Sequence, residues 1–110
     1  CDVRRTAGHL AEVHRPLLEC IAVDVRDHDA LRGLFAERGR DITLLHLESC
    51  TNPSGQLFDF SLLPELKSMA PNCTVVADNT WLTGALFNPL DNGADVVVES
   101  LTKYCSAGRC

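Results

Sequence analysis

The sequence lacks an excess of positive charge, a long apolar run and the common nucleotide-binding glycine patterns. It has 110 residues, with 10 lysines and arginines against 15 aspartates and glutamates, for a formal net charge of −5. Because no basic cluster offsets this charge, nucleic acid is not expected as a partner. No apolar run approaches the roughly 20 residues of a membrane-spanning helix, so no membrane partner is expected. The absence of GxGxxG and GxxxxGK(S/T) disfavours an unrelated nucleotide-binding domain.

Cysteine occurs at six positions, but without the spacing of a metal site. There is no CxxC pair and no His–Cys group with zinc-finger spacing, so no metal is expected. The number alone would allow a disulfide framework. However, the chain is not rich in loops, and Cys20 and Cys73 adjoin apolar runs. We therefore expect reduced thiols in a reducing compartment, the cytoplasm.

The first residues contain neither a methionine nor the apolar core of a signal peptide, which is typical of the interior of a longer chain. The length suits one domain, and the hydrophobic content of 45% is enough for a core. Four apolar runs are nearly continuous rather than alternating, as in strands buried on both faces. They are CIAVDV (20–25), ITLLHLE (42–48), CTVVAD (73–78) and ADVVVES (94–100).

Helix-like segments separate these runs. DHDALRGLFAERG (27–39) has the spacing of a helix of three turns, and FSLLPELKSMA (60–70) suggests a second, with Ser61 as N-cap and Pro64 in its first turn. A third helix is expected at 4–18. The alternation of strands and helices predicts an α/β fold, with a mostly parallel sheet and flanking helices.

Polar residues follow three of the predicted strands, where ligands gather in parallel sheets. Asp78 ends one strand, and a half-buried carboxylate needs a cation or several donors, although it could simply cap the next segment of the chain. An isolated Lys103 would be a solvated charge, yet it follows a strand beside Ser100 and Thr102. We expect Asp78 and Lys103 at one edge of the sheet on adjacent parallel strands, with Ser100 and Thr102 facing a shared pocket.

This combination matches the needs of pyridoxal phosphate. The cofactor requires a lysine for a Schiff base, a carboxylate that holds the pyridinium proton, and hydroxyl groups for its phosphate. The motifs ESCTNP, VVADNTWL and NPLDNGADVVVESLTKY resemble the trans-sulfuration, or Cys/Met-metabolism, family of pyridoxal-phosphate enzymes. This family includes cystathionine γ-synthase, cystathionine lyases and methionine γ-lyase.

The resemblance implies a fold, a reaction and roles for individual residues. The fold would be the large cofactor-binding domain of aspartate-aminotransferase-type (fold type I) enzymes, and the parent enzyme a homodimer or homotetramer. It would eliminate or replace a β or γ substituent of a sulfur-containing amino acid. Lys103 would be the Schiff-base lysine, and Asp78 would pair with the pyridine nitrogen. The other implied contacts are Asn52 at the 3′-oxygen side, Thr80 near the ring, and Ser100 and Thr102 at the phosphate.

Some parts of the family pattern are missing. Cys50 replaces a proline, the segment 3–10 offers no ring-stacking aromatic, and the C-terminal substrate domain is absent. We therefore expect residues 1–110 to be a partial cofactor-binding domain, inactive alone. The alternative is a non-catalytic remnant that retains the fold as an interaction or structural module.

Overall fold

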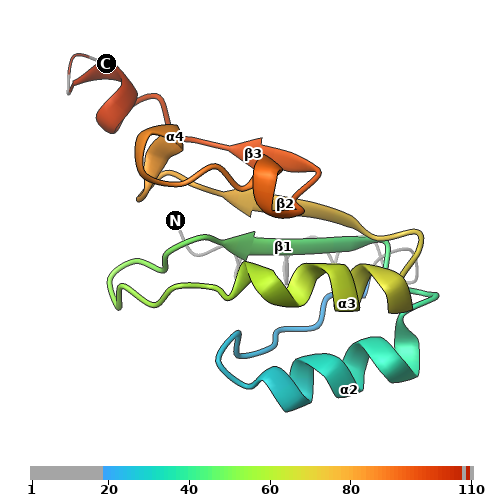
Figure 1. Cartoon of the computed structure of the whole chain (residues 1–110). Coiled ribbons are helices and arrows are strands. Elements are labelled where there is room, and N and C mark those ends of the chain that lie inside the picture. Colours follow the sequence, from blue (N-terminus) through green and yellow to red (C-terminus); the bar gives the residue numbers. More distant parts are fainter. Residues whose placement is uncertain (1–18, 108, 110) are drawn as a thin grey trace.

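The computed structural model describes residues 19–107 and residue 109, so the helix predicted at 4–18 lies outside the described residues. Helices and strands alternate along the described chain, as the sequence predicted (Figure 1). In chain order the elements are α2 (His28–Arg38), β1 (Leu44–Glu48), η1 (Phe60–Leu62), α3 (Leu63–Met69), β2 (Thr74–Asp78), α4 (Thr83–Leu86), η2 (Leu90–Asn92), β3 (Val96–Val98) and η3 (Tyr104–Ser106), where η marks a 3-10 helix.

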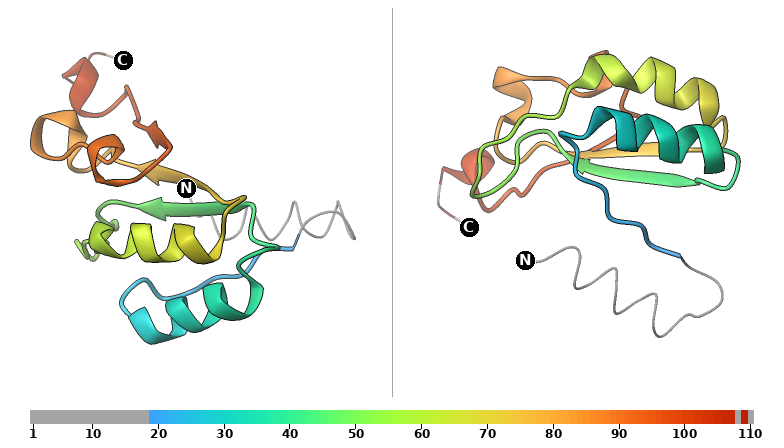
Figure 2. Two further views of the ribbon diagram at one scale, coloured as in Figure 1. Left: turned by 45° about the vertical axis from the view of Figure 1, so that its right-hand side comes forward. Right: turned by 90° about the horizontal axis from the view of Figure 1, so that it is seen from below.

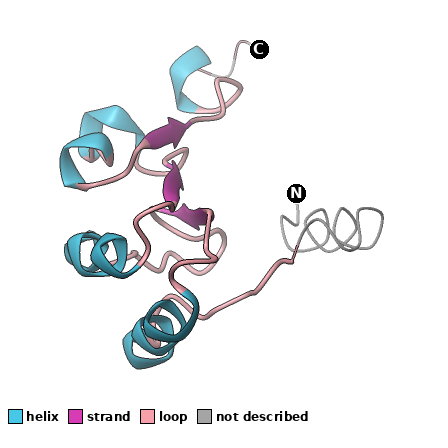
Figure 3. Ribbon diagram, turned by 90° about the vertical axis from the view of Figure 1, so that its right-hand side faces the viewer, coloured by secondary structure: helices cyan, strands magenta, loops and turns pink. Residues whose placement is uncertain are grey.

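The strands form a parallel sheet in the order β1-β2-β3. Glu48 is in register with Asp78, which in turn is in register with Val98. The three strands therefore end at the same edge. Helices α2 and α3 lie side by side over one face of this sheet (Figures 2 and 3). The predicted α/β fold with a parallel sheet and flanking helices is confirmed for the described residues.

The prediction of a strand at 20–25 is wrong. This segment is an extended loop that pairs with no described strand. Val23 and Val25 still pack against the core, while Arg26 donates to the Asp24 carboxylate at 2.6 Å. The apolar pattern thus reports which side chains are covered, but a strand also needs a neighbouring backbone for its hydrogen bonds.

The two predicted helices form, with one correction at a cap. Asp27 caps α2 by accepting a hydrogen bond from the Ala30 amide at 2.9 Å. The second helix begins as η1, and its cap is Asp59 rather than Ser61, because the Asp59 carboxylate accepts from the amide of Ser61 at 3.0 Å. Pro64 lies in the first turn of α3, as predicted.

Gly39 ends α2 for a steric reason. Its backbone is right-handed, with φ −53°, so no special conformation requires glycine. A Cβ atom at this position would collide with the carbonyl groups of Phe35 and Met69. The absence of a side chain therefore lets the end of α2 approach the end of α3.

The core lies between the helices and the sheet. Leu63 and Leu66 of α3 and Val75 and Ala77 of β2 are fully buried there. Three phenylalanines extend this core, with ring centroids 5.2 Å apart for Phe58–Phe60 and 4.8 Å apart for Phe60–Phe87.

The opposite face of the sheet is uncovered in the described structure. Leu44, Val96 and Val98 are 58%, 43% and 47% exposed. Their side chains alternate with those that face the helices. The expectation that the strands are buried on both faces is therefore met on one face of the described residues.

The four cysteines within the described range, Cys20, Cys50, Cys73 and Cys105, are free thiols, as expected. No helix of the described residues has both the length and the apolar character needed to cross a membrane.

Asp95, which directly precedes β3, connects this strand to α3 and β2. One oxygen of its carboxylate accepts from Lys67 Nζ of α3 at 2.6 Å, and the other accepts from the amide of Val75 in β2 at 2.8 Å. The hydrogen bond from Lys67 and the one from the Val75 amide lower the pKa of Asp95. Asp95 thus fixes the entry of β3 against β2 and α3.

Asp95→Asn should lower the free energy of unfolding by about 1 kcal/mol near neutral pH, because it removes a partly exposed ion pair. The pKa of Asp95 is lower in the folded state, so its contribution is present above the unfolded pKa of about 3.9 and is lost as the pH falls below it. Urea unfolding of both proteins at neutral and acidic pH measures this. Asp41→Asn, which removes an exposed carboxylate without a hydrogen-bond partner among the described residues, is the matched control. If the free energies of unfolding of Asp95→Asn and wild type still differ at acidic pH, the stabilisation does not come from the ionised Asp95 carboxylate.

Candidate cofactor site at the carboxyl edge of the sheet

Asp78 lies at the centre of the edge where the strands end. Hydrogen bonds continue on both sides of it: the Ser49 amide donates to the Asp78 carbonyl at 2.9 Å, and the Asn79 amide donates to the Val98 carbonyl at 2.9 Å. The segment after β3 carries Ser100 to Lys103 from this same edge. As predicted, β2 and β3 are adjacent and parallel; Asp78 is the last residue of β2, whereas Lys103 lies in the turns that follow β3 rather than in a strand.

The Asp78 carboxylate is half-buried and has one engaged oxygen. Its Oδ1 accepts from the Thr80 amide at 3.0 Å, which folds the chain back after β2. No described residue donates a hydrogen bond to Oδ2, and no ion pair of the described residues includes Asp78. The side chain therefore both shapes a turn, as the simpler interpretation held, and retains an oxygen able to pair with a cationic ligand.

A hydrogen bond joins the segments that follow β2 and β3. Thr80 Oγ1 accepts from the amide of Ser100 at 2.9 Å. Beyond it the chain turns, and the Lys103 amide donates to the Ser100 carbonyl at 3.1 Å. The side chains of Thr102 and Lys103 are exposed and have no hydrogen-bond or ion-pair partner within the described residues.

Asn52 lies in the turn after β1, where it is exposed. Its neighbours hold this turn: Thr51 Oγ1 and Ser54 Oγ are 2.6 Å apart, and the Gln56 amide donates to Thr51 Oγ1 at 3.0 Å. The Asn52–Pro53 peptide bond is cis. No hydrogen bond links Asn52 to Asp78 or Lys103 in the described structure.

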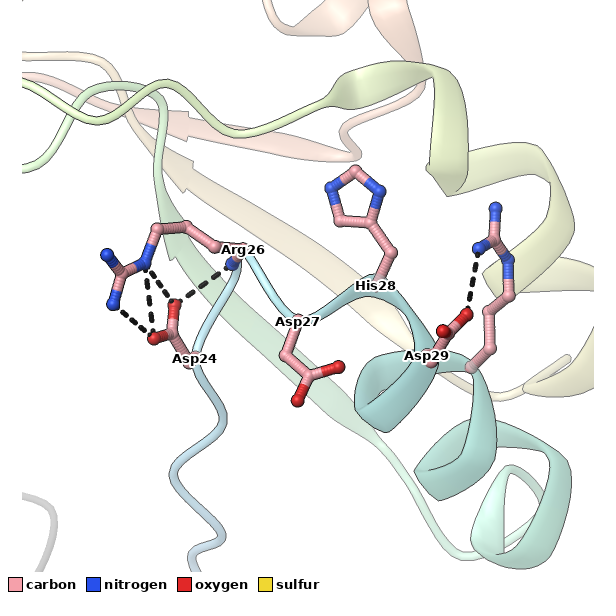
Figure 4. A pocket seen from close by; sticks show the side chains of 6 residues that line it. Asp24, Arg26, Asp27, His28 and Asp29 are labelled. Carbon is pink, nitrogen blue, oxygen red and sulfur yellow. Dashed lines mark hydrogen bonds and ion pairs between the residues drawn. The ribbon is translucent and has the colours of Figure 1, made fainter.

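The pocket drawn in Figure 4 lies elsewhere, at the start of α2. Its charges are largely paired among themselves and with α3, as in Arg26–Asp24 at 2.6 Å and Arg32–Glu65 at 3.0 Å. It contains none of the predicted cofactor residues: its lining is Asp24, Arg26, Asp27, His28, Asp29 and Arg32.

The shared pocket expected for Ser100 and Thr102 is not formed by the described residues. Ser100 is half-buried, whereas Thr102 and Lys103 are exposed. The physical reason is that the chain leaves the sheet after Val98 and forms η3 beyond the edge (Figure 1). Side chains on such a projecting turn have few described neighbours that could enclose them.

Sequence reasoning overlooked two buried polar residues, Ser49 and Asn79, which are 1% and 0% exposed. Ser49 Oγ and Asn79 Oδ1 have no hydrogen-bond partner in the described structure. The Asn79 amide nitrogen donates to the Phe87 carbonyl at 2.8 Å and to Glu99 Oε1 at 3.4 Å. Strand alternation could have found both, since each follows a half-buried acid and must face the core.

Comparison with known proteins identifies the family to which the chain belongs. The sequence pattern of the family described as "Cys/Met metabolism PLP-dependent enzyme" matches residues 6–108. The chain belongs to this family.

Several curated proteins of related sequence are lyases or synthases by name. The chain is 38% identical over 100 residues to a cystathionine β-lyase of Saccharomyces cerevisiae, covering 88% of the chain and 20% of that protein. A methionine γ-lyase of Arabidopsis thaliana is 42% identical over 88 residues, which are 78% of the chain and 19% of the relative. A cystathionine γ-synthase of Escherichia coli is 42% identical over 82 residues, which are 74% of the chain and 20% of the relative. The chain thus spans about a fifth of the length of these relatives.

The residues that follow the strands include chemical groups of the kinds that the cofactor of the family needs. Pyridoxal phosphate needs an amine, an anionic acceptor for its ring nitrogen and donors for its phosphate. The edge offers Lys103 and Thr102 without internal partners, and the second oxygen of Asp78. The chemistry of the available groups therefore matches the three parts of the cofactor.

Thr80→Val should destabilise the segment after β3, because it leaves the Ser100 amide without an acceptor in a partly buried place. The free energy of unfolding should fall by about 1–3 kcal/mol. Thr80→Ser keeps the hydroxyl and serves as the control. Urea unfolding, with hydrogen exchange at the Ser100 amide, measures both. Equal protection of that amide in the two variants would show that the Thr80 hydroxyl does not hold it.

Proposed function

We propose that the natural protein carrying this chain uses pyridoxal phosphate to eliminate or replace a substituent at the β or γ carbon of a sulfur-containing amino acid. Family membership supports the cofactor and the class of chemistry. The observation that carries the proposal for this chain is the register of β2 with β3, because Asp78 ends β2 and the segment that leads to Lys103 begins where β3 ends. The names of the relatives support cystathionine or methionine as the type of substrate.

Each predicted residue has a role that suits its surroundings. Lys103 would bind the aldehyde carbon of the cofactor, and Asp78 would face the ring nitrogen. Ser100 and Thr102 would donate to the phosphate, while Thr80, which accepts from the Ser100 amide, would keep that segment in place beside the ring. Asn52, in the turn after β1, would contact the 3′-oxygen side.

The cofactor, when bound, supplies an electron sink for charge that develops on the substrate carbon. The protein's part is to set protonation states. The Asp78 carboxylate would keep a proton on the ring nitrogen, because a nearby anion favours the cationic form. The Lys103 amine, once released by the incoming amino acid, would move protons between the substrate carbons as a general base and acid.

The chain is proposed to be the central part of a fold type I cofactor-binding domain, inactive alone, within a cytoplasmic homodimer or homotetramer. Two observations favour the second candidate, a non-catalytic remnant that serves as an interaction or structural module. Thr102 and Lys103 are exposed in the described structure, and the segment 3–10 offers no aromatic side chain to stack on the ring. The two candidates differ in whether Lys103 holds the cofactor.

Borohydride reduction of the natural protein incubated with pyridoxal phosphate should attach the cofactor to Lys103, with loss of the visible absorbance band of the lysine-bound cofactor. Peptide mass spectrometry locates the adduct. Lys103→Arg keeps the charge without a reactive amine and is the control. Modification spread over surface lysines at the same level in both proteins would support the non-catalytic remnant.

Asp78→Asn in the natural protein should lower turnover far more than cofactor affinity. The amide keeps the shape and the hydrogen bond from the Thr80 amide but removes the charge that favours a protonated ring. Because the variant loses the charge of the Asp78 carboxylate, its kcat should be lower than that of wild type by about 10²-fold or more. Release of α-keto acid from cystathionine or methionine measures turnover, and titration with the cofactor measures affinity. Near-normal turnover would mean that another group holds the ring nitrogen.

A further inference from the structure

Glu99 links both ends of the loop that carries the proposed cofactor residues. Its Oε1 accepts from the side-chain amide of Asn79 at 3.4 Å, and its Oε2 accepts from the Cys105 thiol, with Sγ at 3.5 Å. Glu99 directly precedes Ser100, and Cys105 directly follows Tyr104. One carboxylate therefore spans the base of the Ser100–Tyr104 loop and ties it to the residue that follows Asp78.

Asn79 is a rigid anchor for this link. It is fully buried, its amide donates to the Val98 carbonyl at 2.9 Å, and its carbonyl accepts from the Thr83 amide at 2.8 Å. Its side-chain nitrogen also donates to the Phe87 carbonyl at 2.8 Å. Both partners of this nitrogen are acceptors, so the orientation of the side-chain amide is fixed.

The contact between Glu99 and Cys105 requires a carboxylate. A thiol is a weak donor and a weak acceptor, so it needs a strong acceptor opposite. The hydrogen bond to Glu99, then the burial of the thiol and the charge of Glu99, raise the pKa of Cys105. The contact therefore favours the protonated thiol, which is the form that can donate. A glutamine at position 99 could still accept from Asn79, but its second group would be an NH₂ facing the sulfur.

We propose that Glu99 and Cys105 are positioning residues that close the base of the Ser100–Tyr104 loop and so fix Lys103 relative to Asp78. This inference rests on the proposed function of Lys103. The same loop has a second internal closure, because the Ser106 hydroxyl lies 3.3 Å from the Thr102 carbonyl oxygen and 3.4 Å from that of Lys103. The Ser100–Tyr104 loop is therefore held by hydrogen bonds at its ends and not by other parts of the described structure packing around it.

The first test measures the link without the cofactor. Alkylation of Cys105 by iodoacetamide is followed against pH by peptide mass spectrometry, with the exposed Cys20 as internal reference. The pH profile of the reaction reports the titration of the Cys105 thiol, because the thiolate is the reactive form. Glu99→Gln should move the Cys105 profile to lower pH and leave that of Cys20 unchanged. Glu37→Gln, which removes an exposed carboxylate from α2, is the matched control. A Cys105 profile that Glu99→Gln does not shift would overturn the link.

The second test measures positioning. Glu99→Gln and Cys105→Ala should each weaken retention of pyridoxal phosphate, and slow its attachment to Lys103, by about two- to fivefold, as expected for one partly exposed hydrogen bond. The double variant should be no worse than either single one, because both changes break the same contact. Cys20→Ala and Glu37→Gln should match wild type. Should Glu99→Gln not fold, Cys105→Ala alone still tests the contact.

The two tests separate the inference from the proposed function. Attachment at Lys103 that is equal in wild type, Glu99→Gln and Cys105→Ala would overturn the positioning role while the proposed function stands. A wild-type protein that does not attach the cofactor to Lys103 would overturn the proposed function and, with it, the positioning role. In that case a shifted Cys105 profile in Glu99→Gln would show the contact to be structural alone.

Discussion

The central strand β2 is the element on which the sheet and the candidate site both depend. Its backbone pairs with β1 on one side and with β3 on the other, and the same ladder continues past its end through the amides of Ser49 and Asn79. Parallel pairing brings like ends together, so the polar residues that follow each strand share an edge. A shift of one residue in this register would turn Asp78 toward the core and Asn79 away from it.

Two aspartates next to this ladder have different surroundings, because both oxygens of one carboxylate are engaged and only one oxygen of the other is. Asp95 is saturated: Lys67 and the Val75 amide bind its two oxygens. Asp78 uses one oxygen for the turn at Thr80 and has no ion-pair partner among the described residues. A half-buried carboxylate without an internal cation is unfavourable unless a donor reaches it. The sequence motif alone does not distinguish the two aspartates, because both end or begin an apolar run.

The extent to which the sequence predicted the structure depends on the range of the interactions. Helix α2 and the three strands were predictable, because periodicity and caps are local properties. The segment 20–25 was misassigned because pairing depends on a neighbour that periodicity does not report. The cap of the second helix was predicted at Ser61 but is Asp59, two residues earlier, because one 3-10 turn precedes the α-helix. The Asn79–Glu99 contact and the exposure of Lys103 depend on how separate strand ends meet, and no single segment encodes that.

The order of the strands in space has a consequence for the order of assembly. Each strand pairs with the one synthesised just before it, because sheet order and chain order coincide. A sheet of this kind can grow in the direction of translation, because each strand closes a loop only to the strand that precedes it in the chain. The turn at Asp78 would leave the ribosome before the segment that contains Lys103 does. The segment after β3 would then be added to a sheet that β1 and β2 already form.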